Sequence, residues 1–218
     1  MNLATIPTWL LIVLSIIPVL SAIILHEIAH GWVAKQLGDD TAERLGRLSL
    51  NPLRHIDPVG TVIVPLVMLV LTNFVFGWAK PVPIDWSHLR RPRRDMVLVA
   101  IAGPASNLLM LIGWILLAKI FASLSFLSPI LASLIISMST IAILVNTILM
   151  VFNLLPLPPL DGGRVAVGLL PASLARPLAR IEPLGLLIII ALLASGLLGQ
   201  WIGPIITQVL RFSQGLIY

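Results

Sequence analysis

Long apolar runs separated by short polar segments dominate the pattern of this chain. The runs cover residues 9–37, 58–76, 96–121, 129–152 and 183–198, and an amphipathic tail follows over 204–218. A helix rises 1.5 Å per residue, so about 20 apolar residues cross the hydrocarbon core of a bilayer. Three of the runs are clearly long enough, whereas the run over 183–198 is marginal unless it extends into the tail. The pattern predicts an all-α polytopic membrane protein, built as a single integral membrane domain over 1–218.

The short basic loops predict how the runs are oriented. Residues 38–57 and 77–95 each carry several arginines, and a third basic loop holds Arg164, Arg176 and Arg180, whereas the connection over 123–128 is uncharged. Because positive loops stay in the cytoplasm, all three basic loops are predicted to lie inside. The run over 58–76 then cannot cross the membrane once. Pro65 near its middle favours a re-entrant element packed within protein; otherwise one loop breaks the charge rule.

Composition excludes an ordinary soluble protein. Hydrophobic residues make up 58% of the chain and charged residues 11%, against typical values of roughly 45–50% and about 25%. The net charge of +5 lies in loops beside the apolar runs, so we expect no nucleic-acid partner. The chain has no cysteine, which excludes disulfides and cysteine-ligated metals. No basic residue precedes the first run and no cleavage site follows it, so a removable signal peptide is not expected.

The first run contains the sequence His26-Glu27-Ile28-Ala29-His30. On a helix this spacing places both imidazoles on one face, one turn apart, where they can bind a single zinc ion. Zinc acidifies water, and Glu27 beside the ligands is the candidate general base. A buried His–Glu pair without a metal would not need the second histidine. Ionisable groups are costly at membrane depth, which favours a functional site.

A tetrahedral zinc with two histidines and one water lacks one protein ligand. Most acidic residues lie in charged loops, but Asp161 follows the fourth run, at the depth predicted for the histidines. Pro156, Pro158 and Pro159 keep the backbone before it extended, and this unwound stretch is a natural partner for an extended substrate strand. The structural alternative makes Asp161 an N-cap of a helix that starts at Arg164.

Three ordered motifs carry a resemblance to a known family. They are HEIAHGW at 26–32, AGPASN at 102–107 and NLLPLPPLDGG at 153–163, joined by the segments GRLSLNPLRHIDPVGT and GWAKPVP. The chain resembles the site-2 protease family of intramembrane zinc metalloproteases, specifically its small bacterial-type members without a PDZ domain. The resemblance covers nearly the whole chain.

The resemblance implies a three-span catalytic core that hydrolyses peptide bonds within the membrane. In it His26, His30 and Asp161 hold one zinc ion and Glu27 activates water. The middle motif corresponds to Gly103 and Asn107, which implies close helix approach and a polar contact facing the site, although Gly103-Pro104 is equally compatible with a plain kink. Residues implied to contact or position substrate are Asn107, Asn153 and Pro156.

Together these features predict cleavage of partly unwound transmembrane segments in a lipid bilayer. The expected location is the bacterial cell membrane, with the site toward the cytoplasm. Three alternatives stay open: a membrane zinc protease with Glu43 or Glu182 as third ligand, a zinc-binding membrane transporter, and a pseudoprotease that does not cleave. A transporter usually shows internal repeats, and none is visible. His55 and His88 are candidate extra ligands, but both lie in arginine-rich loops and are predicted to be ordinary solvated or headgroup-facing histidines.

Overall fold

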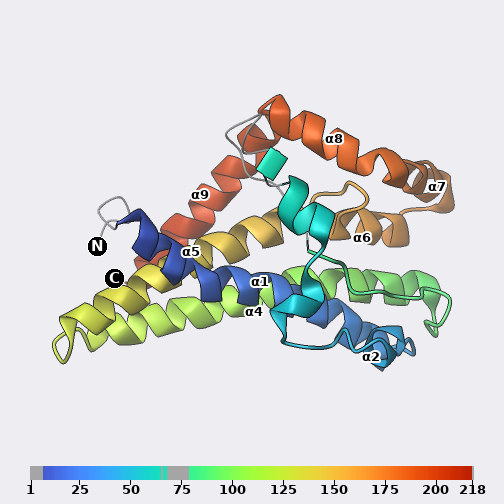
Figure 1. Ribbon diagram of the computed structural model, residues 1–218. Coiled ribbons are helices and arrows are strands. Elements are labelled where there is room, and N and C mark those ends of the chain that lie inside the picture. The colour runs from blue at the N-terminus through green and yellow to red at the C-terminus, as the bar shows by residue number, and fades with distance from the viewer. Residues whose placement is uncertain (1–6, 65, 68–78, 218) are drawn as a thin grey trace.

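A computed structural model describes residues 7–64, 66–67 and 79–217, and among these residues the regular elements are all helical (Figure 1). The helices are α1 (Thr8–Gln36), α2 (Thr41–Arg44), α4 (Pro92–Ser123), α5 (Pro129–Asn153), α6 (Asp161–Leu169), α7 (Ala172–Arg180), α8 (Glu182–Ala194) and α9 (Leu197–Ile217), with short helical turns η2 (Pro52–His55) and η3 (Pro58–Ile63). The predicted all-α class is confirmed.

Helices α1, α4 and α5 are the three that are long and apolar enough to cross a membrane by themselves within the described residues. They contain 29, 32 and 25 residues, or about 38–48 Å of helix, which exceeds a hydrocarbon core of about 30 Å. Large apolar side chains on their outer faces are exposed, such as Ile12 at 61% and Leu109 at 70%. The chain is an integral membrane protein, and the predicted runs over 9–37, 96–121 and 129–152 correspond to these helices.

The predicted run over 183–198 is divided between two helices. Helix α8 has only 13 residues, which is too short to span a membrane alone. Taken together as a pair bent by 69°, α7 and α8 are long and apolar enough to form one broken span. The chain then turns at Gly196, whose φ is +75°, a backbone conformation that glycine adopts without strain. Residues 204–217 of the predicted amphipathic tail over 204–218 therefore fall within the longer helix α9, and residue 218 lies outside the described residues.

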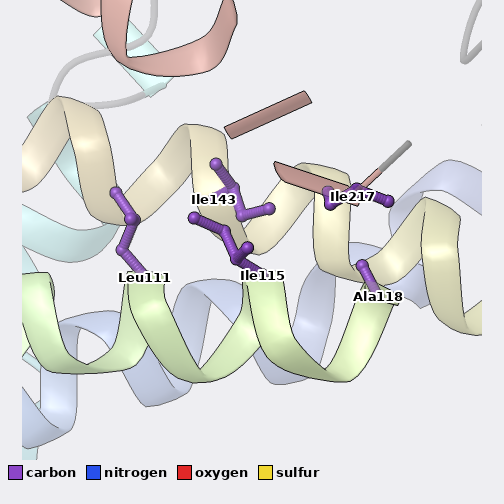
Figure 2. Packing of buried hydrophobic residues seen from close by; sticks show 5 residues of the cluster. All are labelled: Leu111, Ile115, Ala118, Ile143 and Ile217. Carbon is purple, nitrogen blue, oxygen red and sulfur yellow. The ribbon is translucent and has the colours of Figure 1, made fainter. Parts of the chain in front are cut away.

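One cluster of the hydrophobic core lies where α4, α5 and α9 meet. Its members come from all three helices and are almost fully buried (Figure 2): Leu111, Ile115, Ala118, Ile143 and Ile217. Helix α4 also packs along α1 and α6, and α1 packs against α5. This arrangement makes α4 the central helix, with α1 and α5 held on its surface.

In the described part of the connection from α1 to α4, the turn η2 contacts α1. Asp57 begins η3 by accepting hydrogen bonds from the N–H groups of Val59 and Gly60, each at 2.9 Å. The predicted re-entrant element over 58–76, including Pro65, falls mostly outside the described residues and stays a prediction. Residues 79–85 then run without regular secondary structure.

Candidate metal centre

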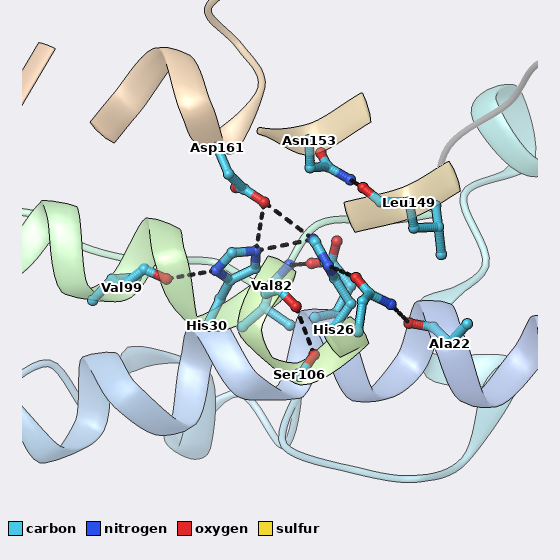
Figure 3. A network of polar contacts seen from close by, with 12 residues as sticks. Ala22, His26, His30, Val82, Val99, Ser106, Leu149, Asn153 and Asp161 are labelled. Carbon is cyan, nitrogen blue, oxygen red and sulfur yellow. Dashed lines mark hydrogen bonds and ion pairs between the residues drawn. The ribbon is translucent and has the colours of Figure 1, made fainter. Parts of the chain in front are cut away.

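His26 and His30 project from one face of α1, one turn apart, as their spacing predicts. Their rings meet edge to face with centroids 4.7 Å apart, and the two Nε2 atoms are separated by 3.1 Å. Asp161 Oδ2 lies 3.2 Å from the Nε2 of His26 and 3.4 Å from that of His30 (Figure 3). Three potential ligand atoms from α1 and α6 therefore converge on one point.

The tautomer of His30 follows from its second ring nitrogen. Its Nδ1 lies 2.7 Å from the backbone oxygen of Val99 on α4. A carbonyl oxygen can only accept, so Nδ1 carries the proton and donates it. The neutral ring then has its lone pair on Nε2, aimed toward Asp161. A metal-binding histidine ordinarily has this arrangement, because the distal hydrogen bond fixes both tautomer and ring orientation.

His26 is fixed in the same way by a side-chain network. Its Nδ1 lies 2.6 Å from Asn107 Oδ1. The orientation of the Asn107 amide is settled by its Nδ2, which donates to Ala22 O at 3.1 Å and to Asn146 Oδ1 at 3.0 Å. Asn107 and Asn146 are both 0% exposed. Nδ1 of His26 is therefore the donor, and its Nε2 lone pair also points at the common site.

The donor set fits zinc. Two imidazole lone pairs and one carboxylate oxygen would repel one another without a cation between them, and Asp161 Oδ2 is buried without a hydrogen-bond partner. Ligands about 2.0–2.1 Å from a tetrahedral zinc ion are separated by about 3.3–3.4 Å, close to the three distances observed. His26, His30 and Asp161 form the group that could hold a metal ion among the described residues.

A non-helical stretch places Asp161. Helix α5 ends at Asn153, residues 154–160 are irregular, and Asp161 is the first residue of α6. That helix has no side-chain cap hydrogen bond, and Asp161 instead faces the histidines, which argues against the N-cap alternative. A Cβ on Gly162 would lie 2.2 Å from Leu154 O, so only glycine lets α6 pack so closely against the stretch.

The stretch over 154–160 offers acceptors and not donors. Each of its N–H groups donates within the chain, those of Leu154, Leu155, Leu157 and Leu160, and its other residues are prolines without an N–H. The sequence predicted that this unwound stretch is a partner for an extended substrate strand. The structure leaves only carbonyl oxygens for such a strand.

Gly103 gives the histidines their space. A Cβ built on this α4 residue would lie 2.4 Å from His30 Nε2 and 2.6 Å from His26 Cε1, closer than side chains approach. The close helix approach implied by the middle motif is therefore an approach of α4 backbone to the ligands themselves.

Glu27 is anchored by the loop before α4. The backbone N–H of Val82 donates to Glu27 Oε2 at 2.9 Å, and Val82 also packs near Gly31, where an added Cβ would lie 2.8 Å from its Cγ1. The glutamate side chain is half-buried. One carboxylate oxygen is thus held by backbone, next to the metal-binding face of α1.

The remaining predicted residues have different surroundings. Asn107 contacts His26 and has no exposed surface, so the structure gives it an orienting contact, and substrate contact stays a prediction. Asn153 Nδ2 donates to Leu149 O at 2.9 Å within its own helix, and Pro156 is exposed. Substrate roles for these two residues also stay predictions.

The prediction of a solvated His55 is wrong. Its side chain is 4% exposed, and its Nε2 lies 2.8 Å from Ser49 O, because the loop folds back on itself. His88 is exposed, with 52% of its side chain accessible.

Sequence reasoning missed Asn146 and Val82. Asn146 is a lone amide inside an apolar run, which is a signal of function at membrane depth. Val82 contributes its backbone N–H to Glu27, and the identity of a residue gives no sign of such a backbone contact.

Comparison with known proteins extends over most of the chain. The model of peptidase family M50 matches residues 14–196. YwhC of Bacillus subtilis (strain 168), named as a candidate zinc metalloprotease, is 37% identical over 183 residues, covering 84% of this chain and 80% of its own. Rip2 of Mycolicibacterium smegmatis, named likewise, is 30% identical over 197 residues, covering 89% and 71%. No solved structure matches.

Proposed function

Because this chain belongs to peptidase family M50 and is an intramembrane zinc metalloprotease of the site-2 type, we propose that it cleaves partly unwound transmembrane segments at the centre formed by His26, His30 and Asp161. Because the chain belongs to a peptidase family, the protease function is favoured over the zinc transporter that the sequence alone left open. The observation that carries the proposal is the convergence of three lone-pair atoms beside a backbone-anchored glutamate.

The residues divide the work of peptide hydrolysis. His26, His30 and Asp161 would hold the zinc ion, which when bound would supply Lewis-acid chemistry to the substrate carbonyl and to water. Glu27 Oε2 is occupied by the Val82 N–H, so Oε1 is the oxygen that accepts a proton from the attacking water. The same carboxyl then returns that proton to the amine as the C–N bond breaks. Asn107 and the Val99 carbonyl accept the Nδ1 hydrogens of the histidines and so keep the rings oriented.

Replacement of Glu27 tests this mechanism. In the full chain reconstituted in liposomes with a model transmembrane peptide, Glu27→Gln should lower kcat by about 10²–10⁴-fold, because amide cannot accept the proton. Zinc content should stay at one ion per chain, and a chelator should abolish wild-type cleavage until zinc is restored. Full activity of the Glu27→Gln variant would refute the role of the glutamate. Absence of cleavage in the zinc-loaded wild type would favour a pseudoprotease.

The proposed location is a bacterial cell membrane with the site toward the cytoplasm. Arg90, Arg91, Arg93 and Arg94 lie at the start of α4, and the loop between α4 and α5 is uncharged, which supports this orientation. The chain lacks cysteine, so single cysteines at the exposed Ser87 and Ser125 can report it. A membrane-impermeant thiol reagent applied to intact cells should label position 125 and not position 87; the reverse pattern would overturn the orientation.

A further inference from the structure

Arg47 is a buried cation without a carboxylate partner among the described residues. Arg47 is 9% exposed. Its Nη2 donates to Lys80 O at 2.9 Å and to Pro81 O at 3.4 Å. Nε is buried and has no hydrogen-bond partner. Burying a guanidinium without a carboxylate partner is energetically costly. A buried arginine that binds only two carbonyl groups therefore suggests that holding those carbonyl groups matters for function.

The two carbonyl groups lie immediately before the N–H that holds Glu27. Lys80 N–H donates to His55 O at 2.9 Å, so Lys80 is fastened through its N–H to His55 and through its C=O to Arg47. Pro81 and Pro83 restrict the backbone on both sides of Val82. The donor to Glu27 is therefore presented from a short segment that is held at its beginning.

We propose that Arg47 is a positioning residue for Glu27, acting through the backbone of residues 80–82. This inference rests on the proposed function of Glu27 as the base. With the segment clamped, Val82 N–H fixes Oε2 and leaves Oε1 directed for proton transfer. Without the clamp, the N–H moves and the carboxyl group rotates away from the reacting atoms, and a displacement of about 1 Å can cost roughly 10²-fold in rate.

The experiment compares variants of the full chain in liposomes, measuring kcat, KM and zinc content with a model transmembrane peptide. Arg47→Gln should lower kcat by about 10–100-fold, with one zinc per chain and KM changed less than about threefold. Arg47→Lys, whose ammonium can still donate to a carbonyl, should recover part of the rate. The matched control is Arg54→Gln, an exposed arginine of the same loop that donates to Gly46 O, and it should behave as wild type.

A second pair of variants isolates the hydrogen bond. Val82→Pro removes the N–H donor from a segment already flanked by prolines, and also changes the side chain and fixes φ. Val82→Ala keeps the donor and shortens the side chain, so it controls for the side-chain change. Val82→Pro should lose kcat as Arg47→Gln does, and Val82→Ala should lose much less. If Arg47 acts through this N–H, the Arg47→Gln/Val82→Pro double variant should be no slower than the slower single variant.

Three results would overturn the inference. They are an unchanged kcat in Arg47→Gln, losses that multiply in the double variant, and a fall in kcat that is accompanied by loss of zinc. If Arg47→Gln does not fold, Arg47→Lys and the two Val82 variants still decide. Failure of the proposed function is distinguishable, since it appears as activity in Glu27→Gln, whereas failure of the inference leaves Glu27→Gln inactive and Arg47→Gln active.

Discussion

The two sides of the metal centre are held in different ways. On the histidine side, two regular helices meet, and each ring donates its Nδ1 hydrogen to an oxygen of α4. On the aspartate side, Asp161 follows an irregular stretch, and its Oδ2 has no hydrogen-bond partner. The histidine rings are thus oriented by hydrogen bonds within the protein. The Asp161 carboxylate has no such bond to its Oδ2 and faces the Nε2 atoms of the two histidines.

This difference separates what folding supplies from what the metal supplies. Packing of α1 against α4 sets the ring tautomers, so that half of the centre needs no cation to form. The carboxylate of Asp161 lies opposite two ring nitrogens, and a bound metal ion makes that position favourable. We therefore expect the histidine side to be rigid with or without zinc, and the aspartate side to depend on it.

The largest expected effect comes from filling the space beside the histidines. Gly103→Ala adds a Cβ that would lie 2.4 Å from His30 Nε2, so the ring must move away from its partner ligands. Zinc affinity should fall by more than about 100-fold, beyond the range for loss of an outer hydrogen bond, and cleavage should fall with it.

The control for this prediction lies ten residues further along the same helix. A Cβ at Gly113 meets nothing within 4 Å, so Gly113→Ala should retain zinc and activity and gain a little helix stability. Zinc titration of both purified variants measures the contrast. Normal zinc affinity in Gly103→Ala would show that the histidine side is not rigid.

The second prediction removes the outer hydrogen bond of one histidine. Asn107→Ala leaves His26 free to rotate and should weaken zinc binding by about 10–100-fold. Asn153→Ala is its counterpart at the end of α5, where the amide donates to Leu149 O within its own helix. Its zinc affinity should be unchanged, and a raised KM would support the predicted substrate role. Equal zinc affinities in the two variants would contradict the proposed orienting contact.

The third prediction concerns metal removal. Chelation should raise amide hydrogen exchange by roughly tenfold around residues 154–164, because local opening becomes easier there. Exchange around residues 22–30 and 99–107 should change much less. Exchange measured by mass spectrometry in nanodiscs, with and without restored zinc, compares the two sides directly. An equal rise on both sides would remove the distinction between them.

The smallest expected effect concerns Asp39, which binds the backbone of Asp85 in the loop that contains Val82. Asp39 is 0% exposed and accepts hydrogen bonds from Thr41 and from Asp85 N–H, the latter at 2.8 Å. Burial raises the pKa of Asp39, but these hydrogen bonds and one from His88 outweigh it, so the pKa lies below the ordinary 3.8. A lowered pKa means that the ionised carboxylate stabilises the fold above about pH 4 and that this is lost as pH falls further.

Thermal unfolding tests this pH dependence. Asp39→Asn should lower Tm by about 2–6 °C at pH 7, from the loss of hydrogen bonds to a charged acceptor. The difference from wild type should be constant between pH 7 and 5 and shrink below about pH 4. Zinc loss at low pH affects both proteins and cancels in the difference. A difference that stays constant to pH 3 would show that the carboxylate charge does not contribute.

Local periodicity made half of the centre predictable. The spacing of His26 and His30 fixes one helical face wherever the helix lies, and the scarcity of acids at membrane depth singled out Asp161. The three long spans followed from length and apolarity alone.

The supporting contacts could not be predicted, because they join distant segments. Val82 N–H reaches Glu27 across 55 positions of sequence and Asn146 reaches Asn107 across 39. The resemblance placed Asn107 near the site but not behind His26, and the arginine-rich loop around His55 wrongly suggested a solvated side chain. These contacts depend on how the loop before α4 and helix α5 pack against the rest of the protein. The pattern of apolar residues does not specify which residues face each other in that packing.

The donor-free stretch over 154–160 has a consequence for selectivity. A peptide laid beside it can be bound only through its own N–H groups. An intact helix has already committed those groups internally, and so has nothing to offer. For a substrate strand bound there, as predicted, we expect such a surface to favour membrane segments that readily lose their helical hydrogen bonds, largely regardless of which side chains they carry.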